Sequence, residues 1–175
     1  MENEIQAPTV KSLGMKWGVI LGVVSLVFFL VTTLAGLQGE SGIQWLGYIP
    51  VIIVMYLAHK EFKDSGDGYM SYGQGLGLGT LMVAISSIIS VSFAYVYIKF
   101  IDTTYMDVIK DKQVEELMKS GLSDAEIERT IEMSQSFMTP EFILIIGLLF
   151  SVFIGFLISL IVSAITKNSN PAMEV

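Results

Sequence analysis

Four long apolar runs, separated by polar segments, make up most of this chain, at residues 17–37, 43–58, 73–101 and 142–165. A helix needs about 20 mostly apolar residues to cross the hydrocarbon core of a bilayer. The first, third and fourth runs reach that length, whereas the second has 16 residues. The pattern predicts an all-α fold: an integral membrane bundle of four transmembrane helices, forming a single membrane domain over residues 1–175.

Two of the runs allow a second interpretation. The first follows two lysines and ends near Thr33-Leu34-Ala35, as a cleaved signal peptide would. Its length exceeds the roughly 7–15 apolar residues usual in signal peptides, which favours an uncleaved helix. The second run is short enough for a re-entrant segment, but aromatic residues near its ends, Trp45 and Tyr56, favour a full span.

Small residues recur at intervals of four in or next to three of the runs. Positions four apart share one face of a helix, and small residues there let a second backbone come close, as in helix association in lipid. We predict that the following residues pack helices together, within one chain or between chains: Gly14, Gly18, Gly22, Gly75, Gly79, Gly147, Ser151, Gly155, Ser159 and Ser163. The glycines after residue 72 match neither GxGxxG nor a Walker loop, so phosphate binding is not expected.

The segment 102–139 is highly charged, with nine acidic and four basic residues. This density of charge argues against burial in lipid. Apolar residues at helical spacing predict a helix that continues the third span through Met118, with Gly121 as its end. Ser123 and Glu126 have the spacing of a capping box, which predicts the start of another helix. We therefore expect an extramembrane helical hairpin between the third and fourth spans.

Composition excludes several kinds of chemistry. The chain is 53% hydrophobic and carries a net charge of −7, so it lacks the basic surface of a nucleic-acid-binding protein. It has no cysteine and one histidine, which excludes disulfides, thiolate catalysis and a multi-histidine metal site within one chain. The apolar cores contain no ionisable residue of the kind that marks ion pathways. No catalytic, cofactor-binding or metal-binding residue is predicted, and His59 is interpreted as an interfacial residue at a helix end.

Basic residues set the expected orientation. Four spans place both termini on one side, together with Lys11, Lys16, Lys60, Lys63 and Lys167. The opposite side also has five basic residues, but they lie in or beside the long acidic segment, and the positive-inside rule weights short segments near helix ends. This predicts cytoplasmic termini and a hairpin on the other face. The polar end segments, 1–12 and 167–175, are expected to be mobile.

Three segments carry a resemblance to a known family: HKEFKDSGDGYMSYGQGLGLG (59–79), YIKFIDTTYMDVI (97–109) with the acidic helix after it, and GLSDAEIE (121–128). With these segments the chain resembles a family of small bacterial inner-membrane proteins, the domain-of-unknown-function family DUF4199. The resemblance covers roughly residues 12–167 and implies a four-helix integral protein of the bacterial inner membrane, with no known activity and no functional residues to transfer. Such proteins often have a proline after the third span; Thr103 and Thr104 stand there in this chain, which favours a continuous helix.

Two functions compete. The leading hypothesis is a non-enzymatic scaffold or interaction subunit, because small-residue faces and a charged hairpin are typical of assembly. Its expected partners are the lipid bilayer and a second protein or a second copy, bound through those faces or the hairpin. The alternative is a channel or transporter component for a small neutral or lipid-like solute. An enzyme is not expected, because a serine nucleophile needs a base within reach and the single histidine was placed at a membrane edge.

Overall fold

A computed structural model describes residues 9–135, 137 and 139–170 of the chain, and this part is all-α. The helices are α1 (Val10–Leu34), α2 (Ser41–Leu46), α3 (Tyr48–Asp64), α4 (Tyr72–Val96), α5 (Tyr105–Lys119), α6 (Asp124–Gln135) and α7 (Pro140–Thr166), with a π-helical turn, η1 (Tyr97–Ile101), directly after α4. Among the described residues, four helical segments are long and apolar enough to span a membrane: Val10–Leu34, Gly42–Asp64, Tyr72–Ile101 and Pro140–Thr166. The chain is thus a helical membrane protein by length and composition.

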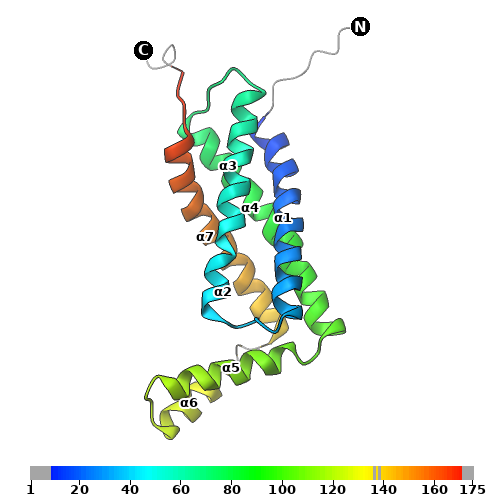
Figure 1. Cartoon of the computed structure of the whole chain (residues 1–175), viewed down its shortest axis with the longest axis vertical. Helices are drawn as coiled ribbons and strands as arrows, with labels where there is room; N and C mark the ends of the chain where they lie inside the picture. The colour runs from blue at the N-terminus through cyan, green and yellow to red at the C-terminus, as the bar shows by residue number, and fades with distance from the viewer. Residues whose placement is uncertain (1–8, 136, 138, 171–175) are drawn as a thin grey trace.

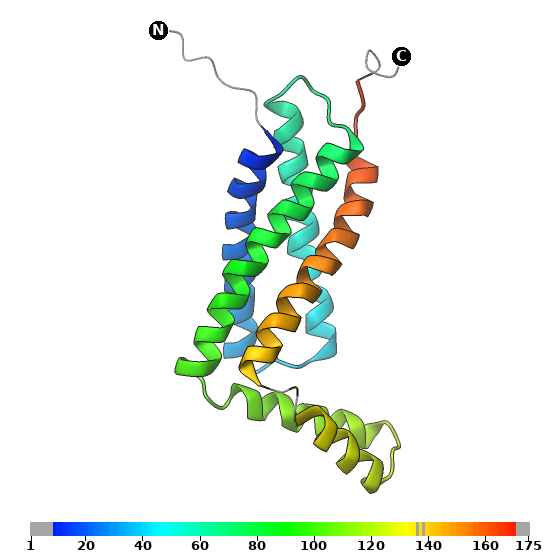
Figure 2. The ribbon, with the colours of Figure 1, turned by 180° about the vertical axis from the view of Figure 1, so that it is seen from behind.

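The four long helices lie side by side, with α4 between α1 and α7 on one face of the bundle and α3 on the opposite face (Figures 1 and 2). It packs against α1 and α7, and α3 contacts α1, α4 and α7. The start of α1, the turn between α3 and α4, and the end of α7 lie at one end, which we call the terminal end (Figure 1). At the opposite end, α5 crosses beneath the bundle and α6 runs beside it. We refer to α5 and α6 together as the α5–α6 pair.

Short polar side chains start three of the long helices. Thr9 Oγ1 accepts the Ser12 N–H at 3.0 Å to start α1, and Ser71 Oγ accepts the Gln74 N–H at 3.2 Å to start α4. Thr139 does the same for α7 at 3.2 Å, one residue before Pro140. Each of these bonds satisfies a backbone donor that the first helical turn leaves unpaired.

The expectation of mobile end segments is wrong for the described parts of them. Residues 10–12 belong to α1, and Asn168 exchanges two backbone hydrogen bonds with Met70, both 2.9 Å. These bonds tie the chain after α7 to the turn before α4. Residues 1–8 and 171–175, to which the same expectation applied, lie outside the described residues.

The second span is longer than the 16 residues that the apolar run predicted. It covers Gly42–Asp64, 23 residues in α2 and α3 together. Most of the added length is residues 59–64. This stretch is mainly polar in sequence, yet it belongs to α3, which ends at Asp64. Several of their side chains bond to neighbouring helices, as described below.

The predicted continuous helix from the third span to Met118 is wrong. After η1 the backbone leaves the helix at Asp102, where φ is −122° and ψ is 86°. The Asp102 carboxylate accepts the N–H of Thr104 at 3.1 Å and its hydroxyl at 2.7 Å. A side chain that bonds to the backbone two residues ahead competes with helical hydrogen bonding, so the chain turns before α5 begins.

The other predicted boundaries of this segment agree with the structure. Gly121 follows the end of α5 with φ of +77°, a conformation that glycine adopts without strain. Glu126 accepts the backbone N–H of Ser123 at 2.9 Å, as in a capping box, and α6 begins at Asp124.

Candidate functional site

The small residues of α7 face α4 in a regular antiparallel register. Gly75 lies against Ser163, Gly79 against Ser159, and Gly155 against Val83; one step further, Ser151 Oγ donates to Ser87 Oγ at 2.9 Å. Each step is four residues on both helices, so one face of α7 follows one face of α4. We call this contact the α4–α7 seam.

The α4–α7 seam is tight enough to exclude a methyl group. A Cβ added at Gly155 would lie 2.8 Å from the Val83 Cβ, and one at Gly79 would lie 3.0 Å from the Ser159 Cβ. Ser159 Oγ donates to the Leu76 carbonyl at 3.2 Å, which joins the two helices by a polar bond as well. Close backbones and hydroxyl bonds of this kind hold helices together in lipid.

The glycines of α1 form a second seam, with α4 running parallel to α1. Gly14, Gly18 and Gly22 face three large side chains that are also four residues apart: Leu81, Ile85 and Ile89. An added Cβ would lie 2.7, 2.8 and 3.0 Å from these three side chains in that order. Both seams therefore join helices of the same chain.

Gly147 differs from the other predicted packing residues. A Cβ there would have no neighbouring atom within 4 Å, so Gly147 makes no close contact with another helix of its own chain. The register of the α4–α7 seam would pair Gly147 with Val91. Instead, both residues line an apolar cavity of about 280 Å³ between α4, α5 and α7.

His59 is fully buried between three helices, so its interpretation as an interfacial residue is wrong. Its Nε2 lies 3.0 Å from the Gly75 carbonyl of α4, and its Nδ1 lies 2.8 Å from the Thr166 hydroxyl of α7. A carbonyl only accepts, so Nε2 carries a proton and donates. Both ring nitrogens are used in joining α3 to its neighbours, which is a structural role.

A helical spacing could have revealed the burial of His59. Met55, Ala58, His59 and Phe62 lie three or four residues apart and form the buried face of α3. The charged residues around His59 are typical of a membrane interface. His59 nevertheless lies on the same helical face as the apolar residues Met55 and Phe62, and this face is buried.

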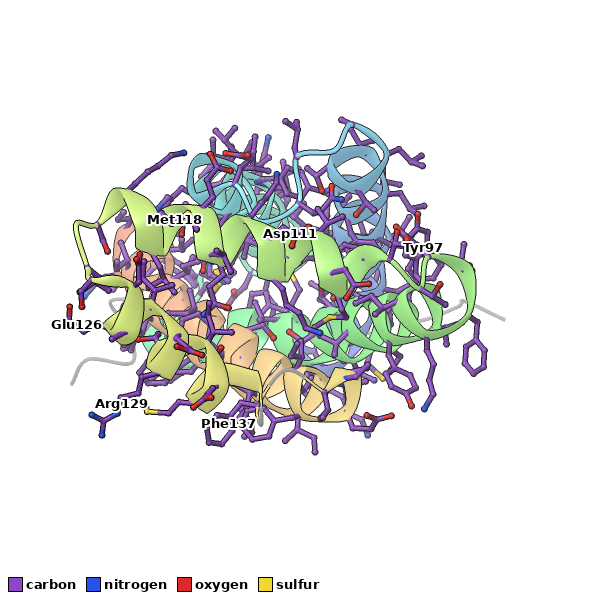
Figure 3. All side chains as sticks on the ribbon, turned by 90° about the horizontal axis from the view of Figure 1, so that it is seen from below. Tyr97, Asp111, Met118, Glu126, Arg129 and Phe137 are labelled. Carbon is purple, nitrogen blue, oxygen red and sulfur yellow. The ribbon has the colours of Figure 1, made fainter. Side chains whose placement is uncertain are left out.

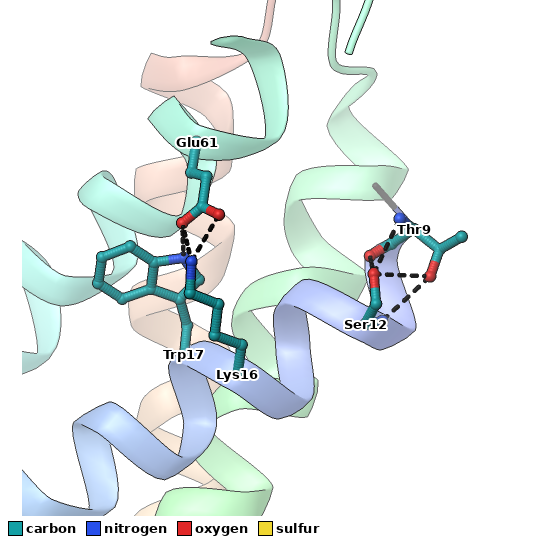
Figure 4. Close-up of polar contacts among 5 residues, drawn as sticks. All are labelled: Thr9, Ser12, Lys16, Trp17 and Glu61. Atoms are coloured by element: carbon teal, nitrogen blue, oxygen red, sulfur yellow. Dashed lines mark hydrogen bonds and ion pairs between the residues drawn. The ribbon is translucent and has the colours of Figure 1, made fainter. Parts of the chain in front are cut away.

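Glu61 joins α3 to α1 at the terminal end (Figure 4). The Lys16 ammonium donates to its two oxygens at 2.7 and 2.9 Å, and the Trp17 indole N–H donates to Oε2 at 2.8 Å. No role was predicted for Glu61 from the sequence. No local pattern could have paired it with Trp17 and Lys16, because the partners lie 44 and 45 residues apart.

The α5–α6 pair is the charged part of the molecule and lies across the end of the bundle (Figure 3). Lys112 attaches α5 to the connection between α1 and α2: its ammonium donates to Glu40 at 2.9 Å and to the Gly36 carbonyl at 3.2 Å. Among the described residues, no group of three or more His, Cys, Asp or Glu is placed to hold a metal ion.

Apolar side chains line a groove between α5 and α6. The groove has a volume of about 480 Å³ and is formed by Val114, Met118, Ile127 and Ile131, with three acidic residues at its rim, Asp124, Glu128 and Glu132. Hydrogen bonds from the Ser123 hydroxyl and backbone lower the pKa of Glu126, and the Lys119 ammonium lowers the pKa of Glu115. Glu126 and Glu115 are therefore charged at neutral pH.

Comparison with known proteins identifies the family of the chain. No curated protein and no solved structure matches it. A family model described as protein of unknown function (DUF4199) matches residues 16–168. The match includes the α4–α7 seam, the buried histidine and the whole α5–α6 pair. The chain belongs to the DUF4199 family.

Proposed function

We propose that this protein is a non-enzymatic scaffold or interaction subunit of the bacterial inner membrane, and that the α5–α6 pair is its partner-binding part. The observation that carries the proposal is the use of the small residues. With Gly147 excepted, the predicted packing residues contact helices of their own chain. Surfaces that could have bound another membrane helix are thus occupied, which leaves the pair as the charged surface with an open groove.

In this proposal the α5–α6 pair is an extramembrane hairpin on the outer face of the membrane, and both termini are cytoplasmic. The distribution of lysines at the terminal end supports this orientation. A cysteine placed at Asp67 and another at Gly121 would be tested with a membrane-impermeant thiol reagent on intact cells. Labelling at residue 121 alone supports the orientation, and labelling at residue 67 alone reverses it.

The chemistry of the groove supports a basic amphipathic helix of another protein as the partner. Its floor is apolar, which suits the apolar face of a helix, and Asp124, Glu128 and Glu132 at the rim suit lysines and arginines beside that face. Residues 102–139 carry nine acidic and four basic residues, so the field around the groove attracts a basic segment.

Photo-crosslinking in native membranes tests the proposal. A benzophenone amino acid would be placed at Met118 in the groove, with Leu157 on the exposed face of α7 as the matched control. We expect a discrete protein adduct from Met118 that disappears when Glu128 and Glu132 are both changed to Lys. An adduct that survives this charge reversal, or that forms equally from Leu157, would contradict the proposed surface.

The serines of the spans support the channel alternative less than the scaffold proposal. Ser151 donates to Ser87, Ser159 to the Leu76 carbonyl, and Ser90 to the Ser86 carbonyl at 2.9 Å. These hydroxyls bond within the bundle, where a pore would require them to face water. Solute flux through liposomes that contain the pure protein would favour a channel component instead.

A further inference from the structure

The apolar cavity beside Gly147 lies outside the proposed partner-binding groove. Its volume is about 280 Å³, and its three main walls come from α4 (Val91, Ala94), α7 (Ile143, Gly147) and α5 (Met106, Ile109), with Phe29 of α1 and Ile98 of η1 completing the lining. An apolar cavity of about 150 Å³ accepts a molecule the size of benzene, so this one has room for roughly twice that volume. Apolar cavities of this kind hold no ordered water, and leaving them unfilled costs stability in proportion to their volume.

Near this cavity, long side chains rather than small residues link α7 to α4 and η1. Glu141, in the first turn of α7, accepts hydrogen bonds from the Lys99 ammonium at 2.8 Å and from the Tyr95 hydroxyl at 3.0 Å. Further along α7, from Ser151 onwards, glycine and serine bring the helices into contact. Gly147 lies between these two parts of α7, with open space beside it.

We propose that this cavity binds one acyl chain of a membrane phospholipid, held between α4, α5 and α7. Two of the three walls belong to helices long and apolar enough to span a bilayer, so lipid chains surround the site in the membrane. The lining is mostly apolar; it includes two tyrosines, Tyr95 and Tyr105, and the Tyr95 hydroxyl is already bonded to Glu141. A hydrocarbon chain matches this lining and needs no polar partner.

The wall formed by α5 links the cavity to the α5–α6 pair. α5 belongs to the charged α5–α6 pair and lies outside the four candidate spans. A chain in the cavity would contact Met106 and Ile109 of α5 directly. The bound lipid would then fix α5 against the bundle, in addition to the bond between Lys112 and Glu40.

The test is a photoactivatable lipid. The full-length protein would be reconstituted in vesicles of phosphatidylethanolamine and phosphatidylglycerol that contain phosphatidylethanolamine with a diazirine in one acyl chain. After illumination, adducts would be mapped by mass spectrometry. We expect labelling on α5 at Met106 and, as the internal reference for ordinary lipid contact, at Leu149, which is 63% exposed on α7.

Gly147→Leu fills the cavity and should remove the Met106 adduct while Leu149 remains labelled. Ala84→Leu is the matched control, because it adds the same side chain to a different apolar groove between α4 and α7, lined by Thr80 and Leu148. It should leave the Met106 adduct unchanged. If Gly147→Leu does not fold, Ala94→Leu fills the same cavity from α4.

Two results would overturn the proposal. One is a wild-type protein labelled at Leu149 but not at Met106. The other is a Met106 adduct that persists in the cavity-filling variants. Neither result bears on the crosslinking test of the α5–α6 groove, so the two proposals fail separately.

Discussion

Replacing each of two glycines of α7 by alanine should change stability in opposite directions. Gly155 and Gly147 lie two turns apart on the same helix, and the same exchange adds one methyl group at each. At Gly147 the methyl enters open space; at Gly155 it would overlap the Val83 side chain, whose Cβ is 2.8 Å away. Val83 is β-branched, so its side chain has little freedom to move aside, and α7 must shift away from α4.

The magnitude follows from two effects. Alanine favours a helix over glycine by about 0.5–1 kcal/mol, and this gain applies equally to both variants. Overpacking a close contact costs about 1–3 kcal/mol, and this cost applies at Gly155 alone. The difference between the variants is therefore about 1–3 kcal/mol, which for a chain of this size corresponds to roughly 2–12 °C in Tm.

Thermal unfolding in detergent, followed by far-UV circular dichroism, measures this difference. We expect Gly147→Ala to unfold at or above the wild-type temperature and Gly155→Ala below it. Gly155→Leu should lower it further. Equal unfolding temperatures for the two alanine variants, or a more stable Gly155→Ala, would refute the assignment of Gly155 to the α4–α7 seam.

Three further predictions concern polar contacts. His59→Leu should lower the free energy of unfolding by about 1–3 kcal/mol, because it removes the bonds to the Thr166 hydroxyl and the Gly75 carbonyl; an unchanged Tm in the same assay would contradict this role. Trp17→Phe should lower the free energy of unfolding by about 0.5–1.5 kcal/mol, because the indole N–H bond to the partly exposed Glu61 carboxylate is lost. Trp17→Phe combined with Glu61→Gln should lower it by less than the sum of the two single changes. Additive effects would contradict a direct coupling between the two side chains. The pKa of Glu126 is lowered from its ordinary value of 4.5, so its stabilisation of the first turn of α6 is present above that value and lost as pH falls through the lowered pKa. Amide resonances of α6 should show this transition by NMR, and Glu126→Gln should not; the same transition in both proteins would assign it to another group.

The seams and their members could be predicted from sequence because helix periodicity is local. A spacing of four places Ser151, Gly155, Ser159 and Ser163 on one face whatever surrounds the helix. The residues that this face contacts cannot be predicted from the same local pattern. Nothing local to α7 indicates that Gly155 lies against Val83, 72 positions earlier, or that both seams close within one chain.

The errors have the same origin. His59 was placed at an interface from its charged neighbours, whereas a hydroxyl 107 residues away and a carbonyl on α4 determine its burial. The end of the third span was judged by the absence of proline, whereas the Asp102 carboxylate turns the chain by bonding to Thr104. In both cases one polar side chain with a specific partner outweighed an average property of the segment.

Gly147 shows why a periodic pattern is necessary for close helix contact but does not ensure it. It continues the stripe of α7 by one regular step, and its counterpart Val91 continues that of α4. Contact at that step requires the two helix axes to remain close. About 1.7 turns before Gly147, Glu141 is bonded to Tyr95 and Lys99, so the start of α7 is linked to α4 and η1 by long side chains instead. A small residue then has the opposite effect, because it enlarges the gap that a larger side chain would fill. The same residue type that closes the α4–α7 seam at Gly155 thus borders the cavity at Gly147, and the separation of the two helices at each step decides between the two outcomes.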